Sequence, residues 1–204
     1  MKKIAFIAFL LAVSVAAGRA QESRQDISLS GFGLIEPYTY SATTYVHASS
    51  PAYGGLLSYR FMLTPSSAIE ANYGITYQNE IKYEVNSAET TYRIETRTQE
   101  ASFAYVRSFN FRKYNPFIEV GPSVNIFLPI INSSTSTLSA RQQKEIGALY
   151  GAGVAYEISP SFDIRAEFRG IATKVPTFND TADNLATNRW WNLYIPTIGV
   201  AYHF

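Results

Sequence analysis

The chain has 204 residues, of which 47% are hydrophobic, 15% aromatic and 16% charged, with no cysteine and a formal net charge of +1 at pH 7. This apolar content excludes a disordered chain, the near-neutral charge argues against a dedicated nucleic-acid binder, and the lack of cysteine excludes disulfide frameworks and thiolate metal sites. A mean hydropathy of −0.06 excludes a bundle of membrane helices but leaves a membrane β-barrel open.

Residues 1–20 have the pattern of a secretory signal peptide. Two lysines precede an apolar stretch over residues 4–17, and small residues occupy positions 18 and 20, just before Gln21. This stretch is shorter than the ~20 residues that cross a bilayer, so we expect cleavage rather than an anchor helix. Cleavage before Gln21 changes the net charge from +1 to −2. The sequence therefore predicts an exported chain whose mature part is residues 21–204.

The mature part alternates apolar and polar residues with the period of two that is typical of β-strands. From Ile69 to Gln78 the alternation has no error, and it resumes over residues 81–85, which allows this strand to run past the thickness of a bilayer. The predicted strands, in chain order, are 27–38, 53–61, 69–78, 100–109, 118–130, 148–158, 162–169 and 190–204.

The connections between these strands alternate between short and long. The short turns are residues 64–67, 110–115 and 159–161, and the long polar connections are residues 39–50, 79–98, 132–146 and 173–189. Short and long connections alternate in this way in up-and-down barrels whose two chain ends lie at the short-turn end. We therefore predict an all-β fold, a single eight-stranded antiparallel up-and-down transmembrane β-barrel over residues 21–204.

Small residues indicate which face of the strands points inward. The small residues on the polar face are Gly74, Gly121, Ser123, Gly151 and Gly153. The crowded interior of an eight-stranded barrel needs such residues, whereas the exterior of a soluble barrel does not. Aromatic residues near the strand ends of the apolar face, among them Trp190 and Trp191, fit the interfacial girdles of membrane barrels. The apolar face is therefore expected to meet lipid, with a soluble periplasmic barrel as the alternative.

The C-terminus and two strands carry a family resemblance. Residues 198–204 end in Phe204 with Tyr202 two positions earlier, which resembles the C-terminal signature of bacterial outer-membrane barrels. Residues 150–156 and 164–169 are similar to strands of the small outer-membrane β-barrel superfamily, which includes the transmembrane domain of outer-membrane protein A and the outer-membrane protein X group. The resemblance covers residues 21–204. It implies a Gram-negative cell envelope, outer-membrane localisation after export, and recognition of Tyr202 and Phe204 by the barrel assembly machinery.

Charged residues on the predicted inner face form a candidate lumen network. They are Arg60, Glu70, Glu119, Glu157, Asp163, Arg165, Glu167 and Arg169. Buried charges must pair, and side chains fill a barrel of this size, so we expect a polar plug; a selective or gated narrow pore for small solutes is the alternative. Arg165 and Glu167 lie two apart on one strand, so their partners are expected on neighbouring strands, with Glu157 as one candidate.

The sequence offers little support for catalysis. His47 with Ser49 or Ser50 could be read as the pair of a lipid-modifying barrel enzyme, but these residues share a predicted loop, and His203 is expected at the interface. No phosphate loop or metal-spaced histidine cluster occurs, so we predict no catalytic site, no metal and no cofactor. The alternating charges of residues 90–100 could offer exposed strand edges to a partner.

These observations predict an integral outer-membrane protein that serves membrane integrity or surface interaction through its long loops. Its expected partners are outer-membrane lipid and lipopolysaccharide, the assembly machinery, and a surface ligand bound by the loops, with no nucleic acid. A narrow porin-like channel is the first alternative, and a lipid-modifying enzyme is the second.

Overall fold

The structure is a computed structural model that describes residues 24–40, 44–48, 52–77, 79–85, 90–132, 140–178 and 187–204. The predicted signal peptide lies outside these ranges. Strands and their connections make up the described part of the chain, in which no helix is long and apolar enough to cross a membrane.

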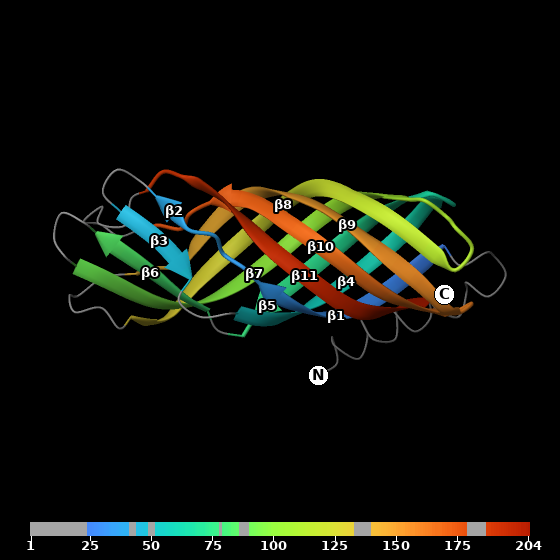
Figure 1. The fold of residues 1–204 in the computed structure, drawn as a ribbon, viewed down its shortest axis with the longest axis horizontal. Helices are drawn as coiled ribbons and strands as arrows, with labels where there is room; N and C mark the ends of the chain where they lie inside the picture. The colour runs from blue at the N-terminus through green and yellow to red at the C-terminus, as the bar shows by residue number, and fades with distance from the viewer. Residues whose placement is uncertain are drawn as a thin grey trace, which may run out of the picture.

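Most strands form one closed antiparallel ring. The strands are β1 Gln25–Leu34, β2 Thr39–Tyr40, β3 Thr44–Ala48, β4 Ala52–Thr64, β5 Ser67–Thr76, β6 Asn79–Val85, β7 Thr90–Ser108, β8 Tyr114–Asn132, β9 Gln143–Ser159, β10 Phe162–Lys174 and β11 Trp190–His203. The ring runs β7-β5-β4-β1-β11-β10-β9-β8 and is closed by the pairing of β8 with β7. Strands β2, β3 and β6 lie beyond one end of the ring, opposite the C-terminus (Figure 1). The predicted eight-stranded antiparallel barrel is confirmed.

One end of the barrel, called here the turn end, carries the tight connections and both ends of the barrel chain. The connections after β4, β7 and β9 are short there, and Arg112 in the β7–β8 turn has a φ of 50°. Ile27 pairs with Tyr202, and the backbone N–H of Phe204 donates to the carbonyl of Gln25 at 3.0 Å. The first and last strands therefore meet at the turn end, as predicted. The opposite end, called the loop end, carries the long connections.

The long polar connections predicted over residues 39–50 and 79–98 contain strands. The first range contains β2 and β3, and the second contains β6 and the beginning of β7. Strand β6 pairs with β7, and β3 pairs with β6, so a small sheet rises from the loop end. We call this sheet, formed by β2, β3, β6 and residues 90–96 of β7, the β-extension.

The β-extension continues the part of the barrel wall formed by β5 and β7. Both β5 and β6 pair with β7, with an interruption that includes Tyr77, so the chain runs past the end of the ring as the alternation at residues 81–85 suggested. The strands here were missed because their exposed face is charged, and charged alternation resembles a polar loop. The first strand also ends earlier than predicted, at Leu34, since Ile35 forms only an isolated bridge with Tyr194.

The outer wall of the barrel is apolar, as the alternation predicted. Along β4 the exposed positions are aromatic or aliphatic, including Tyr53, Leu57 and Tyr59. On the inner side, the predicted small residues allow close packing: a Cβ built at Gly151 would lie 2.7 Å from the Glu119 carboxylate. Small inward residues are therefore needed because large side chains of neighbouring strands lie over them inside the barrel.

The interior of the barrel has two layers. Along β10 the inward positions are charged from Asp163 to Arg169 and then become apolar at Ile171. Inward positions of β1 change in the same way, from Asp26 near the turn end to Leu34 near the loop end. The expected polar interior therefore holds for the turn-end half, whereas for the loop-end half the expectation was wrong.

The apolar layer consists of side chains that water does not reach. It is formed by Phe32, Leu34, Phe127, Leu149, Ile171, Trp191, Leu193 and Ile195. The same core cluster continues into the β-extension and the segment after β10 through Val46, Ile81, Tyr83, Ile94, Val175 and Phe178. Because these elements cover the loop end, its interior can bury apolar side chains in the manner of a soluble protein.

Candidate functional site

The charged layer in the turn-end half is the main cluster of ionisable groups inside the barrel. Its members are Asp26, Arg60, Glu70, Glu100, Glu119, Asp163, Arg165, Glu167, Arg169 and His203. These residues come from β1, β4, β5, β7, β8, β10 and β11. The layer contains more carboxylates than guanidinium groups, so every arginine has more than one carboxylate in its surroundings.

Arg169 is the centre of this layer. Its side chain is fully buried, and its Nη2 donates to Glu100 Oε1 at 2.9 Å and to Ser102 Oγ at 3.3 Å. Its Nε donates to Glu119 Oε1 at 3.1 Å and lies 3.9 Å from a Glu167 oxygen. One guanidinium from β10 thus bridges inward carboxylates of β7 and β8, and its charge-assisted hydrogen bonds tie separate walls of the barrel together.

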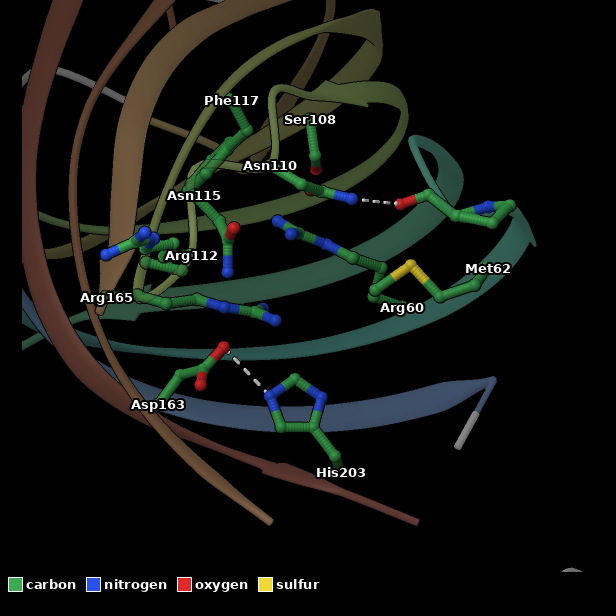
Figure 2. Close-up of a pocket in the computed structure, with 12 residues that line it drawn as sticks. Arg60, Met62, Ser108, Asn110, Arg112, Asn115, Phe117, Asp163, Arg165 and His203 are labelled. Atoms are coloured by element: carbon green, nitrogen blue, oxygen red, sulfur yellow. Dashed lines mark hydrogen bonds and ion pairs between the residues drawn. The ribbon is translucent and has the colours of Figure 1, made fainter. Parts of the chain in front are cut away.

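A second group of ion pairs lies nearer the turn end. Arg60 Nε donates to Glu70 Oε2 at 2.5 Å, and Arg165 Nη2 donates to Asp26 Oδ2 at 2.6 Å. Arg165 Nη1 also lies 3.8 Å from Glu70 Oε2, so Glu70 is shared between two arginines. At the rim, His203 Nε2 lies 2.8 Å from Asp163 Oδ2 (Figure 2). These pairs connect β4, β5, β1, β10 and β11.

The structure brings most of the sequence-predicted lumen residues together. The residues in these ion pairs are Arg60, Glu70, Glu119, Asp163, Arg165, Glu167 and Arg169. Glu157 differs: its side chain is half-buried, and it forms no salt bridge within the described residues. The partner of Arg165 is Asp26 rather than Glu157. Asp26 lies 139 positions away in the chain, so the sequence order gave no indication of this contact.

Three charged-layer residues were missed by the sequence reading. Glu100 was placed at the start of the predicted strand 100–109 but was not counted among the inward charges, although its position in β7 has the same inward phase as Ser102 and Ala104. Asp26 precedes the predicted start of the first strand, although it is two positions before the inward Ser28. His203 was expected at the membrane interface and instead points inward to Asp163. Extending the first predicted strand by one residue would have found Asp26, whereas Glu100 and His203 already lay at inward positions of predicted strands.

The space between the charged and apolar layers is almost filled. The cavity lined by residues of both layers, among them Leu34, Glu100, Asn125 and Ile171, has a volume of about 10 Å³. Such a volume holds about one water molecule. An ion crossing the barrel would therefore have to displace both the ion pairs and the apolar side chains above them.

Glu36 is a separate buried acid beyond β1 and outside the membrane-spanning strands. It accepts a hydrogen bond from Asn79 Nδ2 at 2.6 Å, and its other oxygen has no partner in the described residues. Burial disfavours the carboxylate and raises the pKa of Glu36 to about 7, while the hydrogen bond from Asn79 opposes this change. Glu36 therefore takes up a proton near neutral pH.

Replacement of Glu36 by glutamine should remove a pH-dependent contribution to stability. Because the pKa in the folded state lies above its ordinary value of 4.5, this contribution is complete below about pH 4.5 and is lost as the pH rises through 7. The expected change is up to about 3 kcal/mol. Urea unfolding in detergent micelles at pH 4 and pH 8 should show it in the wild type relative to Glu36→Gln. The control Glu84→Gln, on the exposed face of β6, should follow the wild type, and parallel pH profiles for Glu36→Gln and the wild type would contradict the assignment.

The remaining predicted sites lie at the two ends of the molecule. His47 is on β3 in register with Lys82, not in a loop, and its suggested partners Ser49 and Ser50 lie outside the described residues. Tyr202 is exposed on the outer wall, with its ring centroid 6.0 Å from that of Phe204. No group of acids and histidines able to hold a metal ion occurs among the described residues.

Comparisons with known proteins agree with the barrel. The model of the family described as "Outer membrane protein beta-barrel domain" matches residues 5–204. A comparison of the sequence with curated proteins found no match.

Solved structures share the fold at low sequence identity. OprG from Pseudomonas aeruginosa has a TM-score of 0.62 at 10% identity, covering 90% of this chain and 97% of that chain. Neisserial surface protein A has a TM-score of 0.52 at 15% identity, covering 89% and 98%. The N-terminal barrel domain of Pseudomonas aeruginosa OprF has a TM-score of 0.50 at 16% identity, covering 90% and 100%. Since the family model spans almost the whole chain, this protein belongs to the outer membrane protein beta-barrel domain family and lies in the outer membrane.

Proposed function

We propose that this protein is a closed outer-membrane barrel that supports membrane integrity and presents its β-extension at the cell surface for contact with other molecules. In barrels of this class the short turns face the periplasm and the long connections face the outside. The turn end is then periplasmic, and the loop end with the β-extension is extracellular. No catalytic step is part of the proposal.

The filled interior is the observation that carries the closed state. On the periplasmic side, the guanidinium of Arg169 lies across the lumen between Glu100 and Glu119. On the extracellular side, apolar side chains such as Leu193 and Phe127 are shielded from water. A hydrated ion loses its water in such a region without gaining partners, which is strongly unfavourable. Closure therefore has two independent barriers in series.

The β-extension supports a role in surface contact because it is folded and anchored to the barrel. Its inner face is apolar, and the hydroxyl of Tyr83 donates to the Pro176 carbonyl at 2.6 Å. Its outer face carries Glu84 and Arg93, both exposed, and Tyr45, whose ring centroid lies 4.7 Å from that of Tyr40. Aromatic and charged side chains on a preorganised sheet suit recognition of a partner at low entropic cost.

The apolar outer wall and the last strand support the other proposed partners. Exposed aliphatic residues such as Leu29 and Ile198 lie on neighbouring strands and fit contact with outer-membrane lipid and lipopolysaccharide. Tyr202 and Phe204 lie at the periplasmic end of the wall, where the assembly machinery would recognise the C-terminal strand.

Single-channel recording in a planar lipid bilayer tests the closed state. We expect no steady openings from the wild type, and none from Leu193→Gly, because the charged layer stays intact. The double variant Arg169→Gly with Leu193→Gly should conduct, since it interrupts both layers. Steady openings of the wild type that Arg165→Ala reduces would contradict the proposal.

A narrow channel is the second candidate. Sharing of Glu70 between Arg60 and Arg165 favours it, because shared ion pairs can exchange partners. The wild-type recording decides between this channel and the closed barrel.

A further inference from the structure

The periplasmic mouth of the barrel contains a pocket that the closed-barrel function does not use. It has a volume of about 310 Å³ and lies between the turns after β4 and β7 and the ends of β10 and β11. We infer that this pocket binds a phosphate group, either as the free ion or as the monoester of a small molecule. This inference goes beyond the proposed function and does not depend on it.

Two buried arginines that line the pocket have side-chain donors without a hydrogen-bond partner. Arg60 and Arg165 are 2% and 4% exposed. The guanidinium of Arg60 donates one hydrogen bond to the Glu70 carboxylate, and that of Arg165 donates one to the Asp26 carboxylate. The Nη2 of Arg60 and the Nε of Arg165 have no hydrogen-bond partner within the described residues. Buried donors without a partner are unfavourable, so an acceptor at this place would be stabilising.

The surroundings of these arginines are rich in donors. Figure 2 shows the guanidinium groups of Arg60 and Arg165 reaching into the pocket from opposite sides. Arg112, Asn115 and Ser108 are further lining residues with polar side chains. Guanidinium groups arranged around one space bind the oxygens of a phosphate through charge-assisted hydrogen bonds.

Among the described residues, one carboxylate lines the pocket. Asp163 is the carboxylate among the described lining residues, and His203 Nε2 lies 2.8 Å from it. Asp26 and Glu70 are not part of the lining. Arg60 is also held in place by the ring of Phe117, whose centroid lies 4.7 Å from its guanidinium carbon.

The shape of the site favours phosphate over a simple halide. Donors approach from several walls, and a tetrahedral anion presents an oxygen to each of them, whereas a spherical ion has no such directionality. A volume of about 310 Å³ exceeds that of one water, ≈ 30 Å³, several times over, so phosphate fits with its remaining water or with a small organic group attached.

Titration of the refolded, purified protein in detergent micelles tests this inference. Inorganic phosphate and glycerol 3-phosphate are the two probes, each added in dilute chloride buffer and followed by calorimetry and by the ¹⁵N signals of the arginine Nε groups. We expect saturable binding of at least one probe, with the Nε signal of Arg165, which has no partner, shifting more than those of Arg60 and Arg169, whose Nε groups are already bonded to Glu70 and Glu119. Tighter binding of glycerol 3-phosphate would identify a monoester as the ligand class, and tighter binding of inorganic phosphate the free ion.

A pair of neighbouring turn residues provides matched variants. Arg112 lines the pocket, whereas Lys113 is exposed in the same turn and is not part of the lining. Arg112→Gln should weaken phosphate binding about tenfold, as expected for one lost charge-assisted contact worth about 1.4 kcal/mol. Lys113→Gln should leave the affinity unchanged. The inference is overturned if neither probe binds saturably, or if the two variants lose affinity equally.

Discussion

Replacement of Arg169 by methionine should lower the free energy of unfolding by about 3–5 kcal/mol, the usual cost of removing one partner from a buried ion-pair network. The substitution leaves Glu100 and Glu119 with no counter-charge from β10, and both carboxylates are at least nine-tenths buried. Glu167, 3.9 Å from the Arg169 Nε, adds to the repulsion. The energy lost is therefore mainly the cost of unpaired buried charge rather than the strength of the original bonds.

Urea unfolding in detergent micelles measures this loss. The triple variant Arg169→Met, Glu100→Gln, Glu119→Gln also removes the two unpaired carboxylates. It should recover at least half of the lost free energy of unfolding, because glutamine carries no charge to desolvate. Arg93→Met, at an exposed position of the β-extension, is the matched control and should change stability by less than about 0.5 kcal/mol. A loss below about 1 kcal/mol for Arg169→Met, or no recovery in the triple variant, would show that the charged layer does not hold the barrel walls together.

Replacement of Phe127 by alanine should cost about 3–5 kcal/mol through the cavity it leaves in the apolar layer. Phe127 is fully buried inside the barrel, and its ring centroid lies 6.3 Å from that of Trp191. Strands β8 and β11, which carry these residues, are separated by β9 and β10 in the ring. Their rings therefore meet across the interior, and few other side chains can move to fill the space.

The same unfolding assay, at constant detergent concentration, measures the effect of Phe127→Ala. Phe111→Ala is the matched control, because Phe111 is 65% exposed in the β7–β8 turn outside the barrel interior. Its loss should stay below about 1 kcal/mol. Equal losses at the two positions would mean that the loop-end interior is not packed as a core.

Two layers of opposite character fill the interior of this barrel, which supports the proposed closed state. Ion pairs centred on Arg169 fill the turn-end half, and the apolar layer fills the loop-end half. In the proposed closed state, the apolar layer excludes polar solutes and the charged layer excludes apolar solutes. The proposed phosphate pocket lies at the turn end, on the far side of the charged layer from the apolar layer, so occupation of the pocket requires no passage through the barrel.

The alternation of residues determined the wall of this protein. Strand β5 follows the predicted period from Ile69 onward, and its inward and outward residues are those expected. Strand alternation is local, because successive side chains point to opposite faces whatever the strand pairs with. Short turns such as residues 159–161 are local as well, and they set the antiparallel neighbours.

The β-extension and the apolar layer escaped prediction for a different reason. At Phe32 and Leu34 the inner face becomes apolar while Ile35 is also exposed and apolar, so the two faces no longer differ. Whether such residues are exposed to water depends on which elements lie over the loop end. Those elements are β3, β6 and the segment after β10.

By itself, the sequence of this protein determined that the chain is a barrel, how many strands close it, which face meets lipid and most of the charges that point inward. Only the tertiary structure decided that Arg165 binds Asp26, that Arg169 joins Glu100 to Glu119, and that two arginines keep free donors in one pocket. The physical reason is that closure of the ring brings together residues far apart in the chain. Their contacts depend on the register and tilt of all strands at once, which no single strand encodes.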